Sequence, residues 1–230
     1  MLSLGGLGWW TWQINQRTPT YTTSYGEMQE NVLPDGSRVT LNAHSRLTYQ
    51  AQTHPPVREV YLEGEAFFSV VHQGENQPVP FVVRTRDLTV QVLGTKFNVN
   101  TRRGRTQVVL DDGRVKLKLP TDETTDMLPG ELAEYQARDL QVRKETVDTK
   151  LFTVWRDHKL RFDDTPLTEV ALRLEENYGV TVTFDDPQLG SKRVTGEISA
   201  RELDTILVAL SKLFAISIQR SDSTIHIAES

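Results

Sequence analysis

The chain has 230 residues, a formal net charge of −5 and no cysteine. The lack of cysteine excludes disulfide bonds, thiolate metal sites and a cysteine nucleophile. The 26 basic residues are dispersed among 31 acidic residues, which argues against a nucleic-acid-binding groove, so we expect no nucleic-acid partner. The length allows two modest domains, each with its own hydrophobic core.

The first stretch, Met1 to Gln16, is uncharged and rich in Leu and Gly, and it contains Trp9, Trp10 and Trp12. A transmembrane helix needs about 20 apolar residues and often ends in aromatic residues at the membrane interface. This stretch is shorter than that. We expect residues 1–16 to be the remnant of a transmembrane helix, or its exit, with the upstream part missing. The alternative is an N-terminal tail that packs on the domain.

Residues 17–144 show many short alternating segments separated by turn residues. The stretch Leu33 to Ser37 predicts a tight turn, because Pro presets the backbone, Asp caps it and Gly supplies a positive φ. The pattern predicts a mainly β domain, of the sandwich or solenoid-like kind. Further hairpins are expected from two pairs of segments, Val57–Leu62 with Ala66–Val71, and Gln107–Leu110 with Val115–Leu119.

Residues 145–158 lose the alternation and become charged, which is typical of a linker. Beyond them, apolar residues at helical spacing from Leu167 to Tyr178 predict a helix that Gly179 ends. A second helical pattern follows at Leu203 to Phe214, and short strands precede and follow both helices. Residues 159–230 therefore predict a small α+β domain of order β-α-β-β-α-β-β.

The stretch Val90 to Val99 contains two strand-like segments that flank Gly94 and Thr95. Gly94 permits backbone angles closed to other residues, and Thr95 places a hydroxyl beside the Gly94 carbonyl. Two interpretations stay open. The stretch is either a bulged hairpin at the centre of the β domain, or the site of a reaction of the chain on itself.

The open sheet of the small domain has edges, and edge strands bind strands of other proteins by β-augmentation. Two polar segments are predicted as such partner-binding edges, and the alternative is that they are simply solvated. Their residues are Lys192, Arg193, Val194 and Thr195, and Thr224, Ile225 and His226.

No cofactor or metal is expected. The five histidines are scattered without the spacing of metal ligands. The paired carboxylates Asp111 with Asp112, and Asp185 with Asp186, stand at predicted turns, where Asp is favoured for backbone hydrogen bonding. We therefore interpret them as caps and not as an acid–base pair.

Five motifs give the chain a family resemblance. They are LPDGS at Leu33–Ser37, LEGEAFFSV at Leu62–Val70, PFVV at Pro80–Val83, VLGTKFNV at Val92–Val99 and LPGE at Leu128–Glu131. These motifs occur in the same order as in FecR-type transmembrane regulators of sigma factors, which the chain therefore resembles. The C-terminal unit resembles the short N-terminal signalling fold of secretins and TonB receptors, which in this family follows a tryptophan that Trp155 matches.

The resemblance implies a periplasmic sensor, tethered to the inner membrane, in an anti-sigma factor. In the family, a cytoplasmic segment holds an extracytoplasmic-function sigma factor. The periplasmic part receives a signal from the signalling domain of a TonB-dependent receptor that takes up iron carriers or other substrates. We expect the sigma-binding segment to be missing from this chain, so no residue here is assigned to the sigma factor.

The resemblance also implies self-cleavage, because some members of the family cut a Gly-Thr bond and Gly94-Thr95 matches it. Attack of the Thr95 hydroxyl on the Gly94 carbonyl would exchange the amide for an ester that water opens. The chain is otherwise not expected to be an enzyme. The side chains considered as bases are His44, His72, Asp111 and Asp112.

A different class of function is a β-rich envelope module that binds carbohydrate, or an enzyme, with an adaptor domain attached. It requires an aromatic platform or a cleft of converging carboxylates on the β domain. The phenylalanines and tyrosines mostly follow strand alternation, which favours core positions over a ligand platform.

Overall fold

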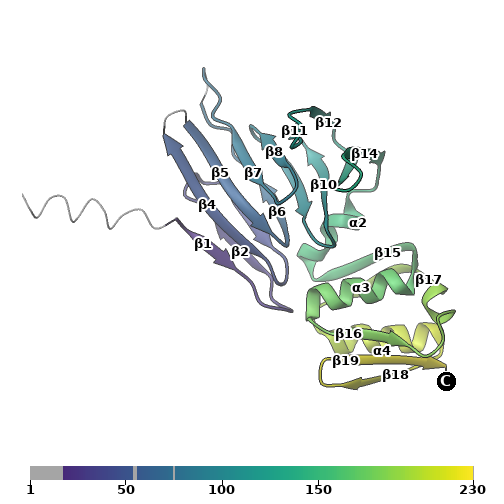
Figure 1. Cartoon of the computed structure of the whole chain (residues 1–230). Coiled ribbons are helices and arrows are strands. Elements are labelled where there is room, and N and C mark those ends of the chain that lie inside the picture. The colour runs from purple at the N-terminus through teal and green to yellow at the C-terminus, as the bar shows by residue number, and fades with distance from the viewer. Residues whose placement is uncertain (1–17, 54–55, 75, 230) are drawn as a thin grey trace, which may run out of the picture.

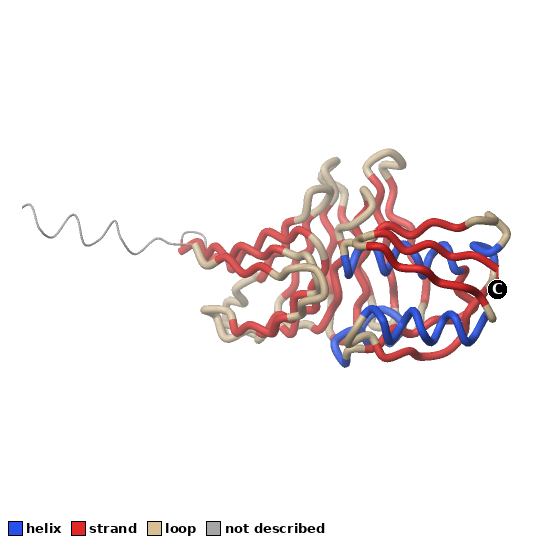
Figure 2. Tube along the Cα trace, turned by 90° about the horizontal axis from the view of Figure 1, so that it is seen from below, coloured by secondary structure: helices blue, strands red, loops and turns tan. Residues whose placement is uncertain are grey.

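The computed structural model describes residues 18–53, 56–74 and 76–229. The expectation for residues 1–16 lies outside these ranges. Within the described ranges, no helix is long and apolar enough to cross a membrane. A strand-only domain comes first, and the helices gather in the C-terminal part of the chain (Figures 1 and 2). The predicted mainly β domain followed by a small α+β domain is confirmed.

The N-terminal domain consists of two seven-stranded sheets. In spatial order, sheet A contains β1 (Thr20–Thr22), β4 (Arg46–Thr53), β5 (Pro56–Glu63), β7 (Phe81–Arg84), β8 (Thr89–Val92), β11 (Val115–Lys118) and β12 (Thr124–Met127). Sheet B contains β2 (Gln29–Val32), β3 (Arg38–Leu41), β6 (Glu65–Ser69), β9 (Lys96–Asn100), β10 (Arg105–Asp112), β13 (Glu131–Gln136) and β14 (Gln141–Thr146).

The strand numbers rise steadily across each sheet, so the chain passes back and forth between the sheets while it advances in one direction. Strands β5 and β7 are parallel, and the other described pairs of these two sheets are antiparallel. The domain is thus a sandwich in its layers and solenoid-like in its progression. Both halves of the prediction apply.

The core between the sheets is built from alternate residues of the strands, because successive side chains of a strand point to opposite faces. Phe68 and Phe97 of sheet B stack with ring centroids 5.0 Å apart, and Phe81 of sheet A meets Phe68 at 6.1 Å. All three side chains are fully buried. Aromatic contacts of this kind add to the area that they bury and hold the two sheets together.

Several predicted hairpins are instead crossovers between the sheets. The Leu33–Ser37 turn does join two paired strands, β2 and β3. However, β5 and β6 lie in different sheets, and so do β10 and β11. The predicted hairpins over 57–71 and 107–119 are therefore wrong. A tight glycine turn followed by alternation looks the same in sequence whether the next strand pairs with the previous one or faces it across the core.

The C-terminal domain has the predicted order β-α-β-β-α-β-β. Its elements are β15 (Lys159–Pro166), α3 (Leu167–Tyr178), β16 (Thr181–Phe184), the short 3-10 turn η2 (Leu189–Ser191), β17 (Arg193–Ser199), α4 (Leu203–Phe214), β18 (Ile216–Ser221) and β19 (Thr224–Glu229). Strands β15 and β17 form one sheet, and β16, β19 and β18 form another in that order. A second hydrophobic core lies within this domain.

The predicted linker is structured. After β14 it forms a short helix α2 (Lys150–Thr153) and the 3-10 helix η1 (Val154–Asp157). The Arg156 guanidinium lies 3.5 Å from the ring centroid of Phe67. Phe67 is buried on the outer face of sheet B, whereas its neighbour Phe68 faces the core. The segment therefore packs on the β domain instead of hanging free between two units.

Candidate functional site

The Gly94-Thr95 bond lies in a crossover between the sheets. Strand β8 belongs to sheet A and β9 to sheet B, so the bulged hairpin, one of the two interpretations of Val90–Val99, is wrong. Thr95 is buried, and its hydroxyl donates to the Arg114 carbonyl at 3.0 Å. The Thr95 carbonyl accepts from the Val70 amide at 3.0 Å. The bond is thus held on its C-terminal side by two neighbouring loops.

Close approach of other chain segments favours glycine at this crossover. A Cβ at Gly94 would lie 3.1 Å from the Cβ of His72. The next crossover, between β10 and β11, lies against the same bond. Gly113 there has φ +95°, and a Cβ on it would lie 2.9 Å from both the Gly94 carbonyl oxygen and Thr95 Oγ1. The two crossovers therefore fit together only because Gly113 has no side chain.

A buried arginine ties the surrounding loops together. The Arg58 side chain is 4% exposed and pairs with Asp35, which is 3% exposed, at 3.0 Å. Its guanidinium also donates to the carbonyls of Val71 at 2.8 Å, Val79 at 2.7 Å and Leu93 at 3.3 Å. The Leu93 carbonyl belongs to the residue directly before Gly94. Arg58 therefore restrains the N-terminal side of the Gly94-Thr95 bond.

Among the described residues, the Thr95 hydroxyl makes no hydrogen bond to the side chains considered as bases, which are His44, His72, Asp111 and Asp112. In the described part of the chain, the hydrogen-bond partner of the Thr95 hydroxyl is the Arg114 carbonyl. Asp111 accepts a hydrogen bond from the Thr149 hydroxyl at 2.9 Å. His44 stacks on Tyr25 with ring centroids 4.2 Å apart. His72 approaches Gly94 through its backbone and Cβ.

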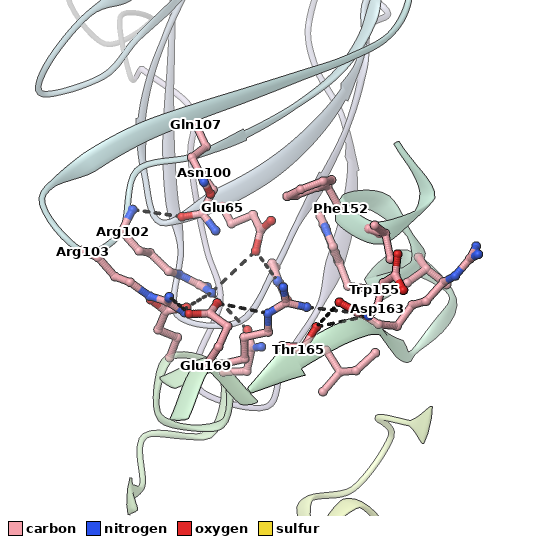
Figure 3. Close-up of a pocket in the computed structure, with 18 of the residues that line it drawn as sticks. Glu65, Asn100, Arg102, Arg103, Gln107, Phe152, Trp155, Asp163, Thr165 and Glu169 are labelled. Atoms are coloured by element: carbon pink, nitrogen blue, oxygen red, sulfur yellow. Dashed lines mark hydrogen bonds and ion pairs between the residues drawn. The ribbon is translucent and has the colours of Figure 1, made fainter. Parts of the chain in front are cut away.

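A second site lies where the two domains meet, and the sequence did not point to it. The turn between β9 and β10 presents Arg103 in a left-handed conformation, with φ +59°. Its guanidinium contacts Glu169 at 2.7 Å and Glu176 at 2.9 Å, and both carboxylates belong to helix α3. Residues seven apart share one face of a helix, so both reach the same turn. Figure 3 shows Arg103 directed towards Glu169.

Arg102 extends this contact into the β domain. It donates to the Asn177 side chain at 3.1 Å and lies 3.6 Å from the Glu65 carboxylate. Glu65 is buried and also accepts hydrogen bonds from Asn42 at 2.7 Å and Asn98 at 2.9 Å. A buried carboxylate with three polar partners is compensated for the loss of its hydration.

The environment of Arg103 stabilises the protonated form of its guanidinium. Burial by itself lowers the pKa of the Arg103 guanidinium, but the hydrogen bonds to Glu176 and Glu169 outweigh burial and raise the pKa above its ordinary value. The Arg103 guanidinium therefore stays charged over the whole physiological pH range. Any change at this joint comes from movement and not from titration of the arginine.

The turn at Tyr25 makes another contact between the domains. The Gly26 amide donates to the Asn177 carbonyl at 2.7 Å. The Tyr25 ring lies against Gly179, where a Cβ would come within 2.7 Å of the ring. Gly179 has φ +66° and ends α3 as predicted. Its lack of a side chain thus serves both the helix end and the joint.

A cavity of about 350 Å³ lies between the β9–β10 turn, α3, β15 and the linker helices (Figure 3). Charged residues from both domains line it, together with Phe152 and Trp155. The indole nitrogen Nε1 of Trp155 is buried and has no hydrogen-bond partner in the described part of the chain. The joint is consequently polar and loosely filled, unlike the two cores.

The two predicted partner-binding segments differ in position. Within the described chain, β17 pairs only with β15, so Arg193, Val194 and Thr195 lie on an edge strand as expected, directly after Lys192. Strand β19 lies between β16 and β18 and pairs with both. The edge position expected for Thr224, Ile225 and His226 is therefore wrong, because the parallel pair with β16 covers that side.

The described residues contain no group of three or more His, Cys, Asp or Glu side chains that could hold a metal ion. Phe67, Phe68, Phe81 and Phe97 are buried, as their strand alternation predicted.

These features define a two-domain protein with a β sandwich joined to a small α+β domain. Residues 19–116 match the family model of the FecR protein, and residues 159–227 match the model of the FecR C-terminal region. Together the two models match more than half of the chain. The chain therefore belongs to the FecR family of anti-sigma regulators.

Solved structures agree with this assignment. A crystal structure of a candidate anti-sigma factor from Parabacteroides distasonis ATCC 8503 is similar, with a TM-score of 0.76 at 28% identity over 93% of this chain and 100% of that chain. A second crystal structure with the same description has a TM-score of 0.76 at 28% identity and covers 92% and 99% of the two chains. No curated protein matches the chain.

Proposed function

We propose that this chain is the periplasmic sensor part of a FecR-type regulator, tethered to the inner membrane. It receives its signal from the signalling domain of a TonB-dependent outer-membrane receptor, of the kind used in iron uptake. A cytoplasmic segment then passes the signal to an extracytoplasmic-function sigma factor. Membership of the FecR family supports the regulatory role, and the free edge of β17 supports a docking site for a partner strand.

The observation that carries the docking site is the one-sided pairing of β17. The strand runs from Arg193 to Ser199 and, among the described residues, pairs with no strand on the side away from β15. Thr195, Gly196 and Glu197 are exposed there. A free edge of this length can accept a strand of another protein, with main-chain hydrogen bonds supplying affinity.

Hydrogen exchange tests this role directly. Residues 18–230 are mixed with the purified signalling domain of a TonB-dependent receptor encoded beside the regulator, and amide exchange is followed by mass spectrometry. We expect binding, with added protection in β17. Strand β19 is the internal control, since it is already paired on both sides. Binding without added protection in β17 would show that this edge is not the docking site. No binding to any such receptor domain would contradict the proposed receptor partner.

We also propose a single self-cleavage at Gly94-Thr95. Thr95 Oγ1 attacks the Gly94 carbonyl carbon, the C–N bond breaks, and the hydroxyl proton ends on the freed Thr95 amine. Water then hydrolyses the ester and leaves a Gly94 carboxylate. The support is geometric, since the hydroxyl is buried beside the bond and the loops around it are fixed.

Intact mass measures the cleavage. The wild-type chain is expected to separate into fragments ending at Gly94 and beginning at Thr95, whereas Thr95→Ala stays whole. Thr95→Ser keeps a hydroxyl and is expected to cleave. A wild-type chain that remains uncut on prolonged incubation, like Thr95→Ala, would exclude the reaction for this protein.

A further inference from the structure

Besides the Tyr25–Gly26 contact with α3, the two domains are joined by two contacts of different kinds. The linker helices α2 and η1 lie on the outer face of sheet B, where Arg156 covers the buried Phe67 ring at 3.5 Å. Burial lowers the pKa of Arg156, as expected for a guanidinium withdrawn from water over an aromatic face. This contact is aromatic and close-packed, and separating it would expose apolar surface.

The second contact is ionic. Arg103 meets Glu169 and Glu176, and the three side chains are 23%, 30% and 17% exposed. These groups are accessible enough to regain water when they separate, so breaking them costs far less than exposing a core. They are also buried enough to be screened only partly by salt. Such ion pairs hold the two domains in one arrangement and can still break and re-form.

The cavity behind this ionic contact also makes the joint easier to open. It holds about 350 Å³ between the β9–β10 turn and the C-terminal domain, and most of its lining is polar or charged. Close-packed interiors leave few voids larger than a water molecule. Because polar and charged side chains predominate in this lining, opening the joint exposes fewer apolar groups than opening a core would.

A pivot lies between the two contacts. His158 follows η1 directly and has a left-handed backbone, with φ +55°. Its amide donates to the Trp155 carbonyl at 2.9 Å, and its carbonyl accepts from Ala200 of the C-terminal domain at 2.7 Å. One residue thus belongs to the docked linker on one side and to the moving domain on the other. Changes of φ and ψ at such a residue turn one domain about another.

We propose that the Arg102–Arg103 turn and the Glu169–Glu176 face of α3 form a releasable latch between the domains. In the closed state the arginines hold α3 against the β domain. In the open state the C-terminal domain turns about His158 while α2 and η1 stay on sheet B, and the 3.3 Å ion pair of Arg161 on β15 with Asp148 of the linker breaks as well. The Tyr25–Gly26 contact with α3 parts at the same time. The proposal rests on the proposed function only for what opens the latch, a strand docking on β17.

A pulsed electron paramagnetic resonance experiment tests the latch without any receptor. Because the chain has no cysteine, Thr124→Cys on β12 and Gln219→Cys on β18 place one spin label on each domain. The wild-type pair is expected to give one narrow distance distribution. Arg103→Glu sets a carboxylate against two others, and the fraction of long distances is expected to rise at least about fivefold. Arg103→Gln, which removes the charge without repulsion, is expected to give a smaller rise.

The matched control is Arg38→Glu, which reverses a charge in an exposed ion pair with Glu30 on β2. It is expected to leave the distances unchanged. A double-mutant cycle adds specificity, since Arg103→Gln with Glu176→Gln is expected to open the joint no more than Arg103→Gln alone. Hydrogen exchange is expected to leave α2 and η1 as protected as in the wild type.

Three results would overturn the latch. These are a distribution for Arg103→Glu equal to that of Arg38→Glu, strict additivity of the two glutamine substitutions, or loss of protection in α2 and η1 together with the opening. None of them bears on the receptor, because no receptor is present. Conversely, if the receptor domain does not protect β17, only the proposed trigger is contradicted, and the latch between the domains is not.

Discussion

At the scale of single residues, the same sequence signal serves two structural purposes in the β domain. Gly36 and Gly113 both follow an aspartate and both have positive φ, +84° and +95°. Gly36 closes a hairpin between paired strands, whereas Gly113 carries the chain from one sheet to the other. The conformation of each turn could be predicted from the residue types. Which sheet the following strand joins could not be predicted, because that depends on the strands on the other side of the core.

The environments of these two glycines predict different costs for a methyl group. At Gly36 nothing lies within 4 Å of an added Cβ, so Gly36→Ala is expected to cost only the left-handed backbone, about 1–2 kcal/mol. At Gly113 the Cβ would meet the Gly94 carbonyl oxygen and Thr95 Oγ1 at 2.9 Å. Gly113→Ala is therefore expected to lose about 1–3 kcal/mol more, as overpacked sites do. Urea unfolding of both variants measures the difference, and equal losses would contradict the close contact.

At the scale of secondary-structure elements, strands were predictable but their partners were not. Alternation records which face of a strand is buried and nothing about the neighbouring strand. The LEGEAFFSV motif is an example. Its Phe67 and Phe68 are both buried, on opposite faces of β6. Two buried faces mean that something covers the outer side of sheet B. The covering element is the segment 150–157, which lies in the stretch 145–158 that was assigned to a linker because it is charged and lacks alternation.

The two phenylalanines predict separable effects. Phe68 lies in the shared core against Phe81 and Phe97, so Phe68→Ala is expected to lower the free energy of unfolding of the β domain by about 3–5 kcal/mol. Phe67→Ala removes the ring under Arg156 and is expected to free α2 and η1 while most of sheet B stays protected. Hydrogen exchange resolved by segment distinguishes them. Equal deprotection of every strand in both variants would show that the linker is not a separate unit.

At the scale of the whole molecule, the order of the domains was predictable and their joint was not. Motifs and helical spacing place both domains along the chain. The Arg102–Arg103 turn is a basic dipeptide between two strands, and Glu169 and Glu176 lie on one face of a predicted helix. Nothing local in the sequence links them. Strand β9, five residues long, begins directly after the Gly94-Thr95 bond and ends directly before this turn. One strand therefore connects the bond proposed to break with the proposed latch.

The topology predicts that a chain broken at this bond stays together. Strand β8 before the bond pairs with β11 after it, and β6 pairs with β9 in the other sheet. Each sheet thus contains strands from both fragments, and they share one core. Tagged residues 18–94 co-expressed with residues 95–230 are expected to elute as a single complex of both.

The core supplies the control for this experiment. Phe97 is fully buried and stacks on Phe68 from the other fragment. A carboxylate cannot be buried there without a partner, so Phe97→Asp is expected to separate the fragments or prevent the complex from forming. If the wild-type fragment 95–230 is soluble but elutes separately from the co-expressed fragment 18–94, the strand pairs across the break are too weak to hold the two fragments together. Cleavage would then release the C-terminal part, instead of leaving a nicked domain whose two pieces remain docked.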